Sequence, residues 1–161
     1  SLISECDWSY DGSKIALKTN DLHGYNSKII VIDMLGNTLK TILSDANGAS
    51  GGLNFSVDGN YLVYCHDVSG YQDDHYRQLD SHIFLYNLTT NTARDLSVES
   101  EKENGTNDLD PRLSPNNSQI IFTNTSNDGI SVKNIMVISI SSDTESERAS
   151  LFSNGEMPDW E

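Results

Sequence analysis

The stretch "DWSYDGSKIAL" (residues 7–17) decides the fold, because the chain repeats its plan further on. The repeats are "NFSVDGNYLVY" (54–64) and "RLSPNNSQIIF" (112–122), and "PDWE" (158–161) begins the plan a fourth time. In each full copy an anchor residue is followed by a turn and then by a strand in which apolar and polar residues alternate. Repetition at this scale indicates one small structural unit per copy.

The anchor residues set the period of the repeat. They are Trp8, Phe55, Leu113 and Trp160, and successive anchors are 47 (8 to 55), 58 (55 to 113) and 47 (113 to 160) residues apart. That spacing is typical of a unit of four short strands. The two tryptophans are therefore predicted to be buried wedges of their units, rather than exposed rings that stack on sugars.

The turns and the later strands of each unit follow the same plan. Asp-Gly (11–12 and 58–59) and Asn-Asn (116–117) suit hairpin turns, because Gly and Asn accept positive φ. The most apolar strands are "KIIVID" (28–33), "HIFLYN" (82–87) and "NIMVIS" (134–139). Weaker fourth strands follow at "TLKTIL" (38–43), "TARDL" (92–96) and "ERASLF" (147–152). No segment shows helical periodicity with caps, so the chain is predicted to be all-β with almost no helix.

Four antiparallel strands per unit predict the blades of a β-propeller, in which each sheet covers the apolar face of the next. The blades are expected at about 4–43, 51–96 and 109–152, with the start of a fourth blade at 157–161. Three blades are half of a six-bladed ring, and the open faces of the first and third would expose more apolar area than a soluble monomer tolerates. A second copy could complete the ring as a homodimer, or the sequence could be part of a longer protein. The repeated anchor Trp160 favours the longer protein.

The copies resemble a known family. An aromatic residue, then Ser-x-Asp-Gly, then a strand ending in Ala and a large hydrophobic residue, is similar to the blade signature of the TolB-like propellers. "DWSYDGSKIAL" is closest to it, whereas "RLSPNNSQIIF" has Leu113 in place of the aromatic residue and Asn-Asn in place of Asp-Gly. The resemblance implies the fold and a periplasmic or cell-envelope location. It implies no single function, because such blades serve as scaffolds, receptor modules and enzyme domains.

Composition excludes some partners. The 161 residues carry 24 Asp and Glu against 10 Lys and Arg, a formal charge of −14. Phosphate contacts need Lys and Arg, so nucleic acid is not expected as a partner. No apolar run is long enough to cross a membrane, and residues 1–17 lack the features of a signal peptide. Cys6 and Cys65 show neither the density of a disulfide scaffold nor the spacing of a zinc site, and both are predicted to be buried free thiols.

The connections are long on one face of the predicted propeller and short on the other. The long ones are 20–27, 44–51, 66–81, 97–109 and 124–132. Long loops on a rigid scaffold commonly carry binding groups, so this face is the predicted surface for a protein or peptide partner. Its richest segment is "HDVSGYQDDHYRQLDSH" (66–82). The residues predicted to form the surface are Asp67, Tyr71, Gln72, Asp73, Asp74, His75 and Tyr76.

The same segment contains candidate metal ligands. Imidazole and carboxylate groups together can bind a divalent transition metal, and His66, His75 and His23 are the candidates. Their spacing matches no compact motif, so no cofactor is predicted and a solvated polar insertion is the favoured interpretation. The acidic run "ESEKENGTNDLD" (99–110) lacks the alternating carboxylates and glycine of a calcium loop, and a solvated loop is again favoured.

Two functions follow as hypotheses. The first is a non-catalytic interaction module whose long-loop face or central channel receives a protein or peptide. The second is the propeller domain of an enzyme, because similar blades gate prolyl-oligopeptidase-like peptidases and hold a metal in oligogalacturonate-lyase-like enzymes. By that resemblance, a lyase-like site would use His23, His66, His75 and Gln72. The sequence contains no Gly-x-Ser-x-Gly motif and no phosphate-binding loop, so no catalytic residue is assigned.

Overall fold

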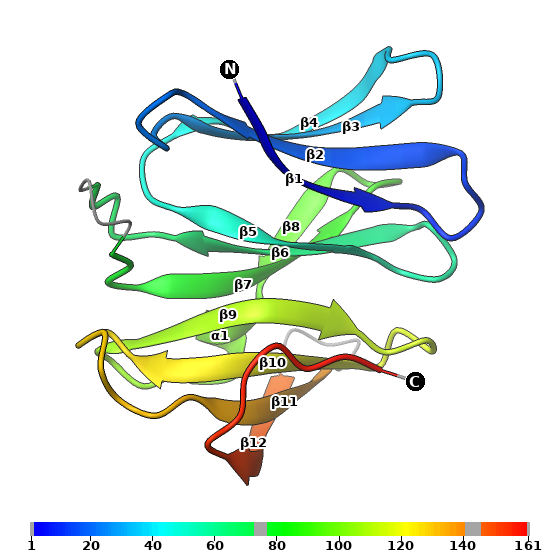
Figure 1. The fold of residues 1–161 in the computed structure, drawn as a ribbon. Coiled ribbons are helices and arrows are strands. Elements are labelled where there is room, and N and C mark those ends of the chain that lie inside the picture. The colour runs from blue at the N-terminus through cyan, green and yellow to red at the C-terminus, as the bar shows by residue number, and fades with distance from the viewer. Residues whose placement is uncertain (1, 73–76, 141–145, 161) are drawn as a thin grey trace.

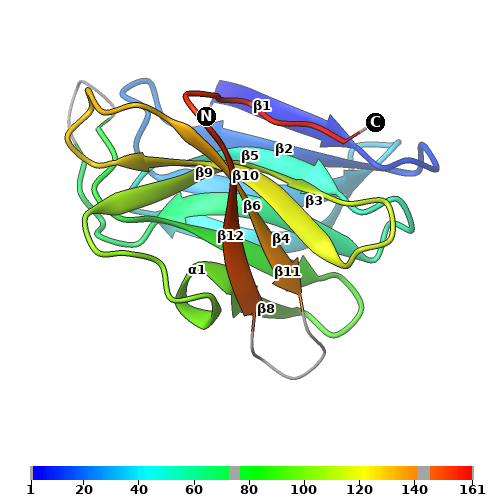
Figure 2. The ribbon, with the colours of Figure 1, turned by 90° about the horizontal axis from the view of Figure 1, so that it is seen from below.

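Three four-stranded antiparallel sheets follow one another along the chain (Figure 1). A computed structural model describes residues 2–72, 77–140 and 146–160. Each sheet takes its strands in chain order, from a first or inner strand to a fourth or outer strand. Figure 2 shows β1, β5 and β9 toward one side of the molecule and β8 and β12 toward the other. The prediction of consecutive four-stranded propeller blades is confirmed.

The strands have the following bounds. Blade 1 contains β1 (Leu2–Trp8), β2 (Lys14–Asn20), β3 (Ser27–Asp33) and β4 (Thr38–Ala46). Blade 2 contains β5 (Ser50–Phe55), β6 (Tyr61–Asp67), β7 (Ser81–Asn87) and β8 (Thr92–Asp95). Blade 3 contains β9 (Thr106–Leu113), β10 (Gln119–Ser126), β11 (Asn134–Ile140) and β12 (Ser146–Ser153).

The repeated turn between the first two strands has a chemical basis in all three blades. Ser9 Oγ accepts a hydrogen bond from the Lys14 amide at 2.9 Å and donates one to Asp11 at 2.8 Å. Ser56 in blade 2 and Ser114 in blade 3 make the same pair of bonds. The positive φ that this turn needs is found at Gly12 (70°), Gly59 (70°) and Asn117 (60°). Asn117 therefore replaces glycine without changing the turn.

The apolar residues form one core between each pair of neighbouring blades. Phe55 belongs to the core between blades 1 and 2, together with Ala16, Ile29 and Val31 of blade 1. Leu113 and Phe122 belong to the core between blades 2 and 3. The anchors also occupy equivalent register positions, with Trp8 opposite Ile15, Phe55 opposite Leu62 and Leu113 opposite Ile120. Phe55 and Leu113 thus point back toward the preceding blade.

The inner strands are joined across the blades by side chains that accept backbone hydrogen bonds. Asp7 Oδ2 on β1 accepts from the Phe55 amide at 2.7 Å, and Asn54 Oδ1 on β5 accepts from the Leu113 amide at 2.9 Å. Glu5 Oε1 accepts from the Leu53 amide at 2.7 Å. Burial raises the pKa of Asp7, although its hydrogen bonds to backbone amides oppose the shift. These bonds satisfy the free edge that each inner strand presents to its neighbour.

The direction of these side chains corrects two predictions of burial. Because Glu5 and Asp7 face blade 2, Cys6 and Trp8 point to the opposite side of β1, which no described blade covers. Trp8 is 58% exposed, and Cys6 is exposed as well. Cys65 is buried as predicted, and burial raises the pKa of its thiol to about 12.

Replacing Trp8 by alanine is expected to change the free energy of unfolding by less than about 1 kcal/mol, because an exposed ring loses little packing. Urea denaturation of the chain measures this change. Tyr10→Ala serves as the control, since Tyr10 lies in the adjacent turn and is 81% exposed. A loss for Trp8→Ala of the size expected for a buried aromatic residue would show that β1 is covered in solution.

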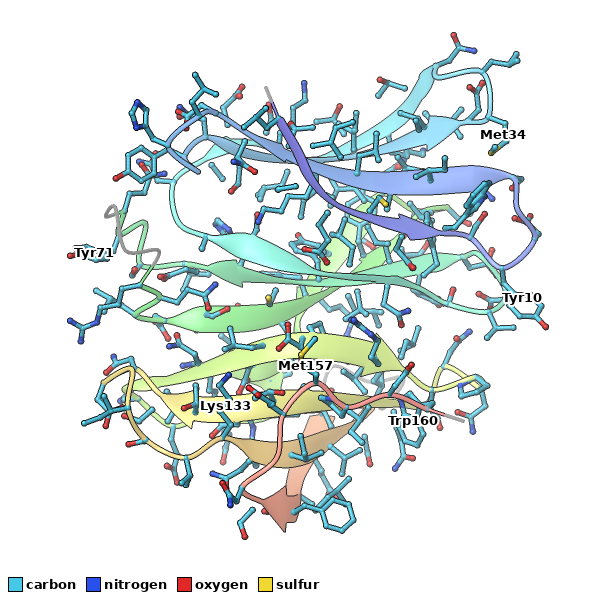
Figure 3. The ribbon with its side chains drawn as sticks, in the orientation of Figure 1. Tyr10, Met34, Tyr71, Lys133, Met157 and Trp160 are labelled. Atoms are coloured by element: carbon cyan, nitrogen blue, oxygen red, sulfur yellow. The ribbon has the colours of Figure 1, made fainter. Side chains whose placement is uncertain are left out.

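The described residues 154–160 are not paired as a strand, and the start of a fourth blade at 157–161 stays a prediction. The segment crosses blade 3, where the Trp160 Nε1 donates to the Arg112 carbonyl at 2.9 Å (Figure 3). Trp160 is half-buried rather than a core wedge. The backbone of this segment repeats that of β5 and β9: the residue three before Phe55, Leu113 and Trp160 has positive φ, at Gly52 (64°), Asp110 (50°) and Met157 (53°).

The acidic run 99–110 is not one solvated loop. A single helical turn, α1 (Leu96–Glu99), begins at the N-cap Asp95, and residues from Thr106 onward belong to β9. Asp108 on β9 is fully buried. In the described part of the chain, no helix is long and apolar enough to cross a membrane.

Candidate functional site

The long connections gather on one face of the three blades. This long-loop face comprises residues 21–26, 47–49, 68–72 with 77–80, 100–105 and 127–133. In Figure 1 these connections lie on the left, and the short turns lie on the right. Figure 3 accordingly shows Tyr71 at the opposite side of the molecule from Tyr10 and Met34.

Asp67 lies beneath this face and not on the predicted surface. Its side chain is fully buried at the end of β6. Oδ1 accepts hydrogen bonds from the amides of Ser69 (2.9 Å) and Asp80 (3.2 Å), and Oδ2 accepts one from Leu79 (2.8 Å). A carboxylate that holds both ends of a connection in this way fixes the base of the loop.

The connections of blades 2 and 3 are hydrogen-bonded to one another. The Asn127 side-chain amide donates to the Leu79 carbonyl at 3.0 Å, and Arg77 Nη2 donates to the Asn127 carbonyl at 3.1 Å. Asn107 Oδ1, which is buried at the start of β9, accepts from the Ser81 amide at 2.8 Å. These bonds hold the two connections together as one surface.

The connections of blades 1 and 2 meet at a narrow cleft. Its lining residues are Gly24, Tyr25, Gly48, Ala49, Tyr71, Gln72 and Arg77. Tyr71 is 41% exposed, and Gln72 Nε2 is buried without a hydrogen-bond partner among the described residues. Tyr71 and Gln72 of the predicted surface thus stand beside Tyr25, which the sequence did not single out. Asp73, Asp74, His75 and Tyr76 lie outside the described residues.

The two candidate metal ligands that the structure describes, His66 and His23, lie on different blades. His66 is half-buried on β6, where burial lowers its pKa, whereas His23 is exposed on the blade 1 connection and stacks on Tyr25. His75 lies outside the described ranges. Within those ranges no three His, Cys, Asp or Glu side chains are placed to hold a metal ion.

A second polar cluster was not predicted as a unit. His82 on β7 lies between Asp80 and Asp95, and Lys102 contacts the same Asp80 oxygen, Oδ1, as His82 does. Asp80 and His82 stand two residues apart, on one face of an extended chain, which is a signal readable from the sequence. Asp95 and Lys102 are 13 and 20 residues from His82 in the sequence. They lie close to it in space because of the pairing of strands in blade 2 and the turn at α1.

Solved structures with this arrangement are β-propeller proteins, whereas no family model and no curated protein matches the chain. TolB from Acinetobacter baumannii is 21% identical with a TM-score of 0.61, over 91% of this chain and 32% of that one. Prolyl oligopeptidase B from Galerina marginata is 11% identical with a TM-score of 0.66, over 96% and 23%. The Cps50 (Swd1) propeller domain from Myceliophteria thermophila is 11% identical with a TM-score of 0.60, over 92% and 37%.

These similarities to solved structures support the fold alone. The identities lie at 21% or below, and the chain spans from about a quarter to just over a third of each of these three neighbours. A TolB structure is one among several kinds of propeller that match. The chain is therefore a three-bladed portion of the β-propeller fold.

Proposed function

We propose that the chain is a non-catalytic scaffold of the TolB-like kind, which receives a protein or peptide partner on its long-loop face. The observation that carries this proposal is the set of hydrogen bonds that join connections of neighbouring blades, from Asn127 to Leu79 and from Arg77 to Asn127. A surface ordered before binding loses little conformational entropy when a partner arrives. By its resemblance to TolB-like proteins, we place the module in the periplasm or cell envelope.

Charge favours a basic partner. Exposed acidic side chains on this face include Glu101, Glu103 and Asp128. Two basic residues there are already paired, Lys102 with Asp80 and Lys133 with Glu156. An extended segment rich in Lys or Arg complements that excess of negative charge, and tyrosine rings beside it provide cation–π contacts.

Replacing Tyr71 by alanine is expected to weaken the binding of a basic peptide about tenfold, because an exposed aromatic at the cleft is the kind of residue that dominates such interfaces. The probes are extended peptides with Lys and Arg at alternate positions, and matched peptides with Glu at those positions. Fluorescence anisotropy at low and at moderate salt measures the affinity.

The control is Tyr10→Ala, which removes an exposed tyrosine on the opposite face. It should leave the affinity unchanged. Equal binding of the acidic and basic peptides, or an equal loss in both variants, would reject the long-loop face as the binding surface.

A peptidase propeller domain is the second candidate, and the match to prolyl oligopeptidase B at a TM-score of 0.66 favours it over other enzyme classes. The full reading frame that contains this chain separates the two proposals. A hydrolase domain in the same polypeptide would support the peptidase. Further blades alone would support the scaffold.

A further inference from the structure

His82 lies between two carboxylates that both need a donor. Its side chain is 12% exposed, with Nδ1 2.8 Å from Asp95 Oδ2 and Nε2 3.1 Å from Asp80 Oδ1. An ionised carboxylate only accepts hydrogen bonds, whereas a neutral imidazole has one N–H and one bare nitrogen. Both contacts are therefore hydrogen bonds only when the ring carries two protons and a positive charge.

The surrounding charges balance only in that state. Lys102 Nζ, from the connection after α1, is 2.7 Å from Asp80 Oδ1, and its side chain is 4% exposed. Two cations then face two anions, and loss of the His82 proton leaves one negative charge in excess. Among the described residues, His66 on β6 is a further titratable group opposite His82, and the neighbouring Phe84 ring is uncharged.

The balance of these effects favours the imidazolium. Burial disfavours the charged ring, but the hydrogen bond and charge of Asp95 and the charge of Asp80 outweigh burial, so the pKa of His82 is raised. The pKa of Asp80 is lowered, because its hydrogen bond to Lys102 and the nearby positive charges outweigh the effect of burial. His66 shifts the other way, because burial lowers its pKa. His82 is thus charged in a pH range where His66 is neutral.

The two bonds of His82 are unequal, so deprotonation breaks one of them first. Asp95 makes the shorter contact and also caps α1 by accepting from the Val98 amide. Asp80 still accepts a hydrogen bond from Lys102 after it has lost the one from His82. The remaining ring proton therefore stays on Nδ1, and Nε2 turns a lone pair toward Asp80 Oδ1 across 3.1 Å.

Asp80 is the last residue before β7 and closes the connection that starts after β6. Its carbonyl accepts from the Val68 amide at 3.0 Å, and its amide donates to Asp67 at 3.2 Å. We infer that His82 is a pH-sensitive latch, which as imidazolium helps to fix Asp80 and the base of the long-loop face, and as neutral imidazole leaves the Asp80 side chain held by Lys102 without it.

The sign of the effect follows from linkage. Since the pKa of His82 is higher in the folded chain, its contribution to stability is complete below about pH 6.5, the ordinary pKa of histidine, and is lost as pH rises through the folded value. The latch itself needs no partner. Its influence on a bound partner rests on the proposed function.

NMR titration of the imidazole Cε1 protons tests the latch. His82 is expected to titrate above pH 6.5 and His66 below it. Amide hydrogen exchange, corrected for intrinsic rates, should show the protection of Val68 and Asp80 falling as His82 loses its proton. Protection of amides on β2 and β3 should stay constant.

His82→Gln is expected to abolish that pH dependence, with His66→Gln as the matched control that keeps it. Asp95→Asn should lower the pKa of His82. This second variant keeps the histidine and can be used if the His82→Gln variant fails to fold. A His82 that titrates below pH 6.5, or one that titrates without any change at Val68 and Asp80, overturns the inference. Failure of the peptides to bind would count against the scaffold alone, since these readouts use the free chain.

Discussion

Replacing Asp108 by alanine is expected to lower the free energy of unfolding by about 3–5 kcal/mol, because removing one member of a buried ion pair leaves the other charge uncompensated. Asp108 is fully buried on β9. Its Oδ2 is 2.8 Å from Arg148 Nη2 on β12 and accepts from the Ser97 hydroxyl on α1 at 2.6 Å. Arg148 also stacks over the Phe122 ring, so the stranded guanidinium would face an apolar core.

Urea denaturation measures this change in the free energy of unfolding. A second variant, Asp108→Asn, separates the effect of the charge from that of the lost side-chain volume. Asparagine keeps the volume and an acceptor for Ser97, but it removes the charge that Arg148 needs, so a large part of the loss should remain. The control is Asp128→Ala, since Asp128 is exposed and its carboxylate accepts from the Ile130 and Ser131 amides of its own turn. An Asp108→Ala midpoint close to that of the control would mean that the ion pair within blade 3 does not stabilise the fold.

The local repeat made the blades predictable. The motif Ser-x-Asp-Gly contains both the serine that makes the hydrogen bonds of the turn and the glycine that adopts positive φ. The alternation of apolar and polar residues in the strands predicts which face of each sheet is apolar. The registers of Trp8, Phe55 and Leu113 accordingly agree with the alignment. The exposure of Trp8 was not predictable from the same pattern, because burial depends on what lies on the other side of the sheet.

The polar clusters were less predictable than the strands. Asp67, Asp108 and His82 occur in segments that composition alone describes as polar insertions or acidic loops. Each of these residues has a structural role because the fold places its hydrogen-bond or ion-pair partners beside it. Arg148, for example, contacts Asp108 although the two are 40 residues apart in the sequence. Spacing along the sequence identifies a site when its ligands share one local element, and none of these clusters does so.

Replacing Gly48 by alanine is expected to lower the free energy of unfolding by roughly 2–5 kcal/mol, the sum of a left-handed backbone and a steric overlap. Gly48 has a φ of 90° and lines the cleft on the long-loop face. A Cβ there would lie 2.2 Å from the Asp67 carbonyl oxygen, which is backbone and cannot rotate away. Relief would have to separate Ala49 from Asp67, whose amide donates to the Ala49 carbonyl at 2.8 Å.

Gly36→Ala isolates the steric part of that loss. Gly36 has a φ of 85°, but a Cβ there meets nothing within 4 Å, so only the backbone term of about 1–2 kcal/mol applies. Comparing the two urea midpoints therefore gives the cost of crowding beneath the cleft. Because Asp67 holds Leu79 and Asp80 in place, the Gly48 variant should also lose amide protection at those two residues, while the Gly36 variant keeps it. Equal midpoints for the two variants would show that β5 and β6 can separate at Gly48 without loss, and that the base of the cleft is less rigid than these contacts require.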